Sequence, residues 1–490
     1  MFKRIALVLL AAVIVLAVAV GVNTVRHGSR QLAAIPVPAF MVDEKGVVDR
    51  LAAAIRLQTV SSYDDSTQNA EEFLKLHAML ESSFPKIHST LTREKIGDLS
   101  LLYTWPGSDS SLAPLMLIAH QDVVPISPGT EKDWKTEPFA GEVKDGFVWG
   151  RGAWDDKGNL ITQMEAVELL LTEGFKPKRT IYLAYGADEE TSGQRGAMRI
   201  AALLKARGVK LDFIIDEGLL ITEGIVPGLT PPAALIGVTE KGYISFRIKT
   251  TATPGHSSMP QPQGDNAIAK LSGIMSRLEN EQMPAAIEGV SREMFETVAP
   301  EISGFNRVAL SNLWLFGPIV RAQLERASGT NATIRTTTAL TMLQAGNKDN
   351  VIPGVAEGTV NFRLLPGDTR ESVLEHVKSK IGDPSVEISA LNFSSEPAPV
   401  SSTTAASYQL INRTVRSLFP GTVVAPGLMV GATDSRYYVG LTNNIYRFSP
   451  VRARAEDLAR FHGVNERIST ANVVELVRFY HEMLRSAGAQ

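Results

Sequence analysis

Between residues 114 and 215 the chain alternates short apolar runs with helix-like stretches, and this alternation restricts the fold more than any other feature. Three apolar runs read as buried strands: 114–119, 180–186 and 211–215. Two stretches between them have helical spacing and are followed by glycine: 160–172 and 196–207. Strands that alternate with helices are typical of a mostly parallel α/β sheet with right-handed crossovers.

Acidic residues and a histidine directly follow these three strands. His120 and Asp122 follow the first strand, Asp188–Glu190 the second and Asp216–Glu217 the third. In open α/β sheets, functional groups gather beyond the carboxyl ends of the strands. The sequence therefore predicts one site at this edge of the sheet.

Residue types within these clusters indicate metal chemistry. His120 and Asp122 are two apart and point to the same side, so Asp122 can accept a hydrogen bond from the second ring nitrogen of a metal-bound His120. Glu189 and Glu190 are either part of a solvated acidic loop or two acids that repel each other unless cations are near. Because adjacent side chains point in different directions, we assign Glu190 as a metal ligand and Glu189 as the general base.

Two more positions extend the pattern. Asp155 lies in the glycine-flanked loop 150–158, where it is either a turn residue bonded to local backbone or a carboxylate that bridges two metal ions about 3.5–4 Å apart. His462 lies beside Gly463 before the last helical stretch. It is either a surface histidine or the second neutral nitrogen donor that two metal ions require.

Composition removes several function classes. The chain has no cysteine, which excludes disulfides, thiolate metal sites and a cysteine nucleophile. The net charge is −3 and no basic stripe is present, so nucleic acid is not an expected partner. The chain also lacks a Gly-x-Ser-x-Gly elbow, which argues against a serine hydrolase.

An uncharged apolar run of 18 residues, 5–22, follows Lys3 and Arg4. A bilayer-spanning helix needs at least about 17–18 such residues, so the run is a membrane anchor or a long signal peptide cleaved after Ala17-Val-Ala19. We favour the anchor. Positive charge before the run places the amino end in the cytoplasm and the catalytic part outside it.

The pattern changes near residue 240. Strand-like and helix-like segments then follow in a β-α-β-β-α-β order, the ferredoxin-like arrangement: 243–249, 266–278, 338–344, 358–364, 370–381 and 385–391. Residues 282–335 form an insertion within it that the sequence does not place. We predict a membrane segment, a catalytic domain in two parts and an inserted domain, with these limits: 1–30, 45–239, 397–490 and 240–396.

The combined clusters resemble the two-zinc metallopeptidase and amidohydrolase family of aminoacylase, carboxypeptidase G and succinyl-diaminopimelate desuccinylase. Five motifs are most similar to its carboxypeptidase S and N-fatty-acyl-amino-acid hydrolase branch: Trp134–Phe139, Gly150–Ala153, Asp216–Gly218, Glu240–Gly242 and Phe461–Glu466. The resemblance covers about residues 45–485.

The resemblance implies two zinc ions per subunit, although cobalt and manganese suit the same donors. The implied ligands, each matched by position, are His120, Asp155, Glu190, Asp216 and His462. Glu217 stays open as the alternative to Asp216. Asp122 resembles the acid that orients the histidine and Glu189 the base. The resemblance also implies a cis peptide between Asp155 and Asp156.

The inserted domain resembles the family's lid and dimerisation domain, which implies a homodimer. His256, Asn350 and Arg363 resemble its substrate-binding residues, and the loop from Gly431 to Arg436 resembles the segment at the substrate end. We therefore expect a zinc-dependent hydrolase of amide bonds in dipeptides, at C-terminal residues or in N-acyl amino acids. The alternative is a membrane-anchored binding protein with an inactive site.

Overall fold

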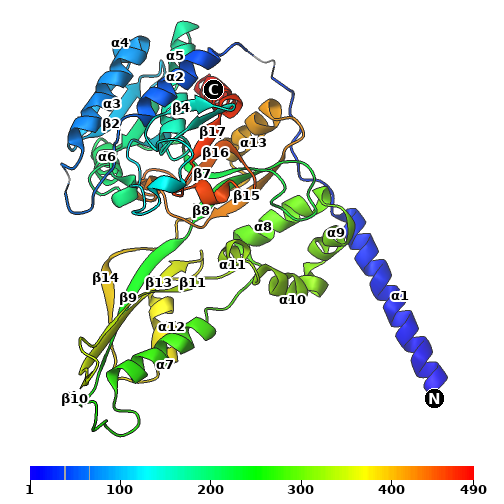
Figure 1. The fold of residues 1–490 in the computed structure, drawn as a ribbon. Helices are drawn as coiled ribbons and strands as arrows, with labels where there is room; N and C mark the ends of the chain where they lie inside the picture. The colour runs from blue at the N-terminus through cyan, green and yellow to red at the C-terminus, as the bar shows by residue number, and fades with distance from the viewer. Residues whose placement is uncertain (38–39, 66, 490) are drawn as a thin grey trace.

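The computed structural model describes residues 1–37, 40–65 and 67–489, and an eight-stranded sheet forms its centre (Figure 1). The strand order is β1-β2-β6-β3-β7-β16-β8-β15. The four central strands β6, β3, β7 and β16 are parallel neighbours, and β15 is parallel to β8. The expected mostly parallel α/β sheet is confirmed. The strands are β1 (Thr92–Ile96), β2 (Ser100–Trp105), β3 (Leu115–His120), β6 (Ile181–Gly186), β7 (Phe213–Thr222), β8 (Ala233–Glu240), β15 (Val423–Met429) and β16 (Ile445–Ala453).

Helices cover both faces of this sheet. The buried side chains of α2, α5 and α14 join those of the strands in one apolar core, while α6 packs with the other face. In α14, buried residues recur at helical spacing, among them Val473, Leu476, Val477 and Tyr480. The helices of this part are α2 (Glu44–Ile55), α3 (Ala70–Ser83), α4 (Pro85–Thr90), α5 (Lys157–Thr172), α6 (Ala197–Ala206), α13 (Ala406–Leu418) and α14 (Thr470–Gly488). A small sheet of β4 (Glu142–Lys144), β5 (Phe147–Trp149) and β17 (Arg467–Ser469) adjoins them.

A second, antiparallel sheet has the order β11-β13-β9-β14 and its own apolar core under α7 and α12. Its elements are β9 (Gly242–Thr251), α7 (Ala267–Asn280), β11 (Thr337–Ala345), β13 (Val355–Leu364), α12 (Arg370–Ile381) and β14 (Glu387–Ser395). This is the expected ferredoxin-like β-α-β-β-α-β order. The chain enters it between β8 and β9 and leaves it after β14, close to the predicted domain limits, which stay predictions. The short strands β10 (Gly255–His256) and β12 (Val351–Ile352) pair near one end of this sheet.

The insertion that the sequence did not place rests on the large sheet. It contains α8 (Gly289–Val298), α9 (Gly304–Ser311), α10 (Leu313–Leu324) and α11 (Ser328–Ile334). Val298 and Ile302 bury against Val423 and Ala425 of β15, so α8 closes this edge of the sheet. The position of the insertion thus depends on apolar contacts with a strand more than 120 residues later in the chain.

The first helix, α1 (Phe2–Arg26), buries none of its residues and projects from the body (Figure 1). Its length and composition are sufficient for a membrane span, and it lies near the amino terminus, where signal sequences also occur.

Candidate metal centre

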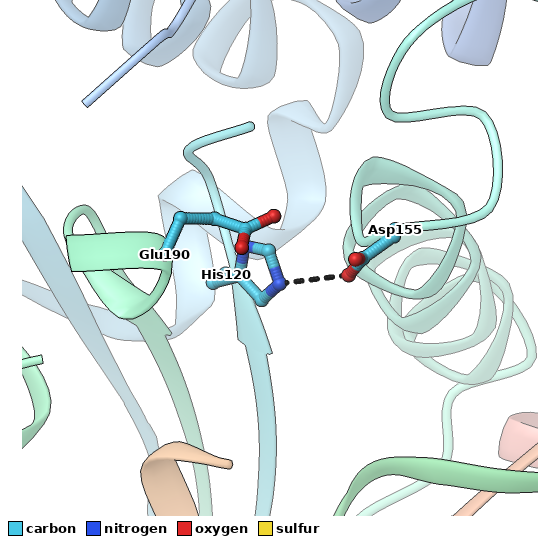
Figure 2. A group of neighbouring side chains, drawn as sticks. All are labelled: His120, Asp155 and Glu190. Carbon is cyan, nitrogen blue, oxygen red and sulfur yellow. Dashed lines mark hydrogen bonds and ion pairs between the residues drawn. The ribbon is translucent and has the colours of Figure 1, made fainter. Parts of the chain in front are cut away.

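His120 and Asp155 lie at the centre of the site (Figure 2). His120 is the last residue of β3 and is almost fully buried. Its Nε2 atom lies 3.0 Å from Asp155 Oδ1. Asp155 Oδ2 lies 2.7 Å from Nε2 of His462. One carboxylate thus presents an oxygen to each histidine, the arrangement required of a bridging ligand. The peptide bond between Asp155 and Asp156 is cis.

Asp122 joins His120 to the loop that carries Glu189 and Glu190. Asp122 Oδ1 lies 3.4 Å from His120 Nδ1. Its two oxygens accept the backbone N–H groups of Glu189 and Glu190, each at 3.1 Å, and Ser61 Oγ donates to Oδ2 at 2.7 Å. His120 Nδ1 also lies 3.0 Å from the backbone carbonyl oxygen of Asp122. The backbone and side chain of Asp122 therefore both face the imidazole ring, and its carboxylate positions the acidic loop after β6.

Glu190 points into the cluster. Its Oε1 atom lies 3.2 Å from His462 Nε2, yet this buried oxygen accepts no hydrogen bond from the described residues. A buried carboxylate oxygen without a donor is costly unless a cation binds it. Glu189, on the same turn, lies 4.0 Å from the guanidinium Nη1 of Arg436.

Glu217, rather than Asp216, reaches His120. Glu217 Oε1 lies 3.5 Å from His120 Nε2. Both oxygens of Asp216 instead accept backbone N–H groups, those of Glu217 and Ser435, at 2.9 Å. The register of β7 on β16 skips from Asp216 to Leu219, and Gly218 between them has a φ of +147°. This bulge re-aims Glu217 towards the cluster, so the geometry favours the alternative that the sequence left open.

Two residues for which no separate role was predicted connect the loops of Asp155 and His462. Glu466 is fully buried and accepts Arg151 Nη1 at 2.6 Å. It also accepts the N–H groups of Gly152, Trp154 and Asp155 at 2.9–3.1 Å. Arg151 Nη2 donates to the carbonyls of His462 and Gly463 at 3.1 Å. The one sequence signal for these residues is that Arg151 lies in the motif Gly150–Ala153 and Glu466 in the motif Phe461–Glu466.

The electrostatics of the cluster favour bound cations. Burial, together with the Asp155 charge, raises the pKa of Glu217 to about 8. Burial, then the Asp155 charge, also raises the pKa of Glu190. Burial would lower the pKa of His462, but the carboxylates of Asp155 and Glu190 raise it to about 10. Two overlapping groups of ligand atoms lie close enough together to hold a cation: those of His120, Asp155 and Glu190, and those of His120, Asp156 and Glu217. Two imidazoles and several carboxylates without thiolates form a donor set that fits zinc.

Arg363 lies at the end of β13 nearest the large sheet. It pairs with Tyr243 across the strands, and its guanidinium lies 4.7 Å from the centre of the Tyr243 ring. Burial lowers the pKa of Arg363, and the charge of Arg436 adds to the effect. Gly431 follows β15, in the loop that leads to Arg436. These residues therefore connect the second sheet with the side of the site that holds Glu189.

His256 and Asn350 lie elsewhere. The backbone N–H of Ser257 donates to the Asn350 carbonyl at 3.1 Å, and His256 Nδ1 lies 2.8 Å from Ser258 Oγ. Figure 1 shows β10, which carries His256, at the end of the second sheet farthest from the large sheet. Within one chain, the structure does not bring these two residues to the cluster.

Comparisons with known proteins find a family match and similar sequences. The model of peptidase family M20/M25/M40 matches residues 116–486. The chain is 43% identical over 449 residues to N-fatty-acyl-amino acid synthase/hydrolase PM20D1 of Xenopus tropicalis, covering 91% of this chain and 86% of the relative. It is 32% identical to carboxypeptidase S of Saccharomyces cerevisiae, covering 91% and 84%.

Among solved structures, an M20 family metallo-carboxypeptidase from Sulfolobus solfataricus has a TM-score of 0.64 at 18% identity, covering 91% of this chain and 99% of that one. Human carnosine dipeptidase 1 has a TM-score of 0.60 at 15% identity, covering 91% and 97%. These structures share the fold described above.

Proposed function

Because this chain belongs to peptidase family M20/M25/M40 and is a hydrolase of the carboxypeptidase or aminoacylase type, we propose that it cleaves amide bonds at a two-zinc site. The observation that carries the proposal is the Asp155 carboxylate, whose two oxygens face His120 and His462 at 3.0 and 2.7 Å. Dinuclear hydrolases use such a carboxylate between their ions.

The ligand set divides around Asp155. His120, Asp155 and Glu217 would hold one ion, and His462, Asp155 and Glu190 the other. Two contacts support this division, that of Glu217 with His120 at 3.5 Å and that of Glu190 with His462 at 3.2 Å. When bound, zinc ions polarise the scissile carbonyl and acidify the attacking water.

Glu189 is the proposed general base. It takes a proton from the attacking water and delivers it to the leaving amine. Its backbone is fixed by Asp122, and its carboxylate lies close to Arg436. Burial raises the pKa of Glu189 well above its ordinary value, which moves a carboxyl towards the range useful to a base near neutral pH.

We propose that the substrates carry a free carboxylate beside the scissile amide. A carboxypeptidase substrate and an N-fatty-acyl amino acid, the compounds named for the relatives, share this group. Arg363 supports the proposal because a guanidinium matches carboxylate geometry with two parallel hydrogen bonds. Gly431 and its loop would border the same end of the substrate.

Location and assembly are also proposed. Residues 5–22 in α1 would anchor the chain, with the catalytic part outside the cytoplasm; cleavage of a signal would give a secreted form. A homodimer would form through the second sheet. Its edge strand β11 exposes Leu340, Met342 and Leu343, and an exposed apolar edge favours pairing with another chain. His256 and Asn350 would then act on the partner's site.

The test is hydrolysis by zinc-loaded protein of dipeptides and of short- and long-chain N-acyl amino acids. Glu189→Gln should keep its metal and lose turnover by roughly 10²–10⁴-fold, the contribution of an acid–base group. Glu142→Gln, on the exposed strand β4, is the matched control. Near-normal kcat in metal-replete Glu189→Gln protein would remove the assignment. Metal binding without hydrolysis of any amide would indicate the binding-protein alternative.

A further inference from the structure

The helix α10 exposes several apolar side chains to solvent. None of its residues, Leu313–Leu324, is buried. Trp314 is 60% exposed and Ile319 65%, and Phe305 of the neighbouring α9 is 65% exposed. The Phe305 ring lies 5.6 Å from that of Phe316 in α10, so apolar side chains of the two helices adjoin. Large exposed apolar surface often marks an interaction site. We call α9 and α10 with Trp314, Ile319 and Phe305 the α9–α10 surface.

Basic residues surround Trp314. A cavity of about 330 Å³ on one side is lined by Arg292 and Arg321 together with Trp314. A cavity of about 400 Å³ on the other is lined by Arg26, Arg30 and again Arg292 and Trp314. Glu296 pairs with Arg30 and Arg292, each at 2.9 Å, and Glu288 also lines the first cavity. Arg321 lies 3.9 Å from Glu325. Four arginines against three glutamates leave a small excess of positive charge.

The α9–α10 surface is attached to the end of α1. Asn23 Nδ2 donates to the Ser311 carbonyl at 2.6 Å and to Asn312 Oδ1 at 3.1 Å. Asn312 Nδ2 donates to Thr24 Oγ1 at 2.9 Å. Ser311 and Asn312 join α9 to α10, so the connection between these helices is bonded to the polar turn directly after the apolar run 5–22. Figure 1 shows α10 on the side of the body towards which α1 projects.

From this continuity we propose that the α9–α10 surface contacts the bilayer that α1 enters. Trp314, Phe305 and Ile319 lie against the acyl chains near the surface of the bilayer, and the surrounding arginines contact acidic lipid phosphates. Tryptophan and arginine suit this depth, because each has an apolar body and a polar end. Acidic head groups also attract clustered basic residues. The proposal rests on α1 being an anchor, and it adds a second attachment that fixes the orientation of the catalytic body.

Tryptophan fluorescence tests the proposal on the full chain. Trp314 is one of five tryptophans; the other four, Trp105, Trp134, Trp149 and Trp154, are buried in the catalytic part. The chain is reconstituted into vesicles of acidic phospholipid, with plain or dibrominated acyl chains that quench fluorescence at short range. We expect brominated lipid to remove up to about one fifth of the emission, the share of one tryptophan in five. In Trp314→Phe this loss should disappear while amide hydrolysis continues.

A charge variant tests the arginines. Arg292→Gln/Arg321→Gln should reduce quenching in acidic vesicles to the level that unmodified protein shows in zwitterionic vesicles. Equal quenching by acidic and zwitterionic lipid in unmodified protein would overturn the role of the arginines.

The remaining outcomes separate this inference from the others. If the protein floats with vesicles but brominated lipid does not quench its fluorescence, the proposed bilayer contact of the α9–α10 surface is wrong and the anchor proposal stands. Chain that does not float overturns both, while hydrolysis in the same sample still reports on the proposed activity. In detergent, aqueous iodide quenches exposed tryptophan. If Trp314 became better shielded from iodide as the protein concentration increased, the surface would be assigned to a second copy of the chain instead.

Discussion

Replacing Glu466 with glutamine should weaken both the fold and the metal centre. Glu466 is fully buried, pairs with Arg151 and accepts three backbone N–H groups in the loop before Asp155. The amide has one accepting oxygen instead of two, and its NH₂ group would face a guanidinium or backbone donors. Arg151 would remain buried without a counter-charge.

The magnitude follows from this burial. Removing one partner of a buried ion pair costs about 3–5 kcal/mol. A domain of roughly 150–250 residues loses about 2–4 °C in Tm for each kcal/mol, so Glu466→Gln should lower Tm by about 6–20 °C. Arg151 also donates to the carbonyls of His462 and Gly463, so the loop of His462 should loosen and the bound metal should fall below that of unmodified protein.

Thermal unfolding and metal analysis of dialysed protein measure the two effects. Glu475→Gln makes the same chemical change in a half-buried pair with Arg452 at 2.8 Å, where pairs contribute about 0–1 kcal/mol; it should shift Tm by a few degrees at most. The reasoning is refuted if Glu466→Gln unfolds within the range of this control and keeps its full metal content.

Other expected outcomes concern the third acid, the substrate carboxylate and a buried lysine. Glu217→Ala should lower metal content more than Asp216→Ala, because Glu217 contacts His120; metal analysis that gives the opposite order would restore Asp216. Arg363→Lys should lower kcat/KM for free-acid substrates and hardly change turnover of their amides. The expected loss of transition-state stabilisation is about 1.5–3 kcal/mol, the range for hydrogen bonds to charged groups. Equal hydrolysis of acids and amides by unmodified enzyme would contradict this. Burial, with the Arg363 charge, lowers the pKa of Lys241 to about 7. In the unfolded chain this lysine stays protonated to about pH 10.4. Between pH 7 and pH 10.4 the unfolded state therefore binds more protons than the folded state, so the free energy of unfolding rises with pH and falls again as the pH drops towards 7. Tm should therefore rise from pH 7 to pH 9 more steeply in unmodified protein than in Lys241→Met; parallel slopes would exclude the lowered pKa.

Much of the fold followed from periodicity in the sequence. The alternation between 114 and 215 predicted the central parallel strands, and the predicted helix 370–381 has the bounds of α12. The antiparallel strands β1 and β2 at one edge were not predicted, because short apolar runs at a sheet edge do not differ from those of loops or helices.

The candidate site depended on two kinds of information. Strand-end positions predicted that His120 would lie near Glu190, and the structure brings them together. The choice between Asp216 and Glu217 depended on a bulge at Gly218, and a change of register by one or two residues leaves no periodic signal. The pairing of Arg151 with Glu466 joins positions 315 apart, which a single sequence does not reveal.

The place of β16 in the sheet also governs how the protein is made. β16 is among the last strands to be synthesised, yet it lies between β7 and β8, which are more than 200 residues earlier. His462 and Glu466 follow it directly. The ribosome therefore completes nearly the whole polypeptide before the sheet can close, and long-range pairing of this kind is slow. Because His462 is among the last residues to be synthesised, the proposed metal centre can assemble only when nearly the whole chain has been made.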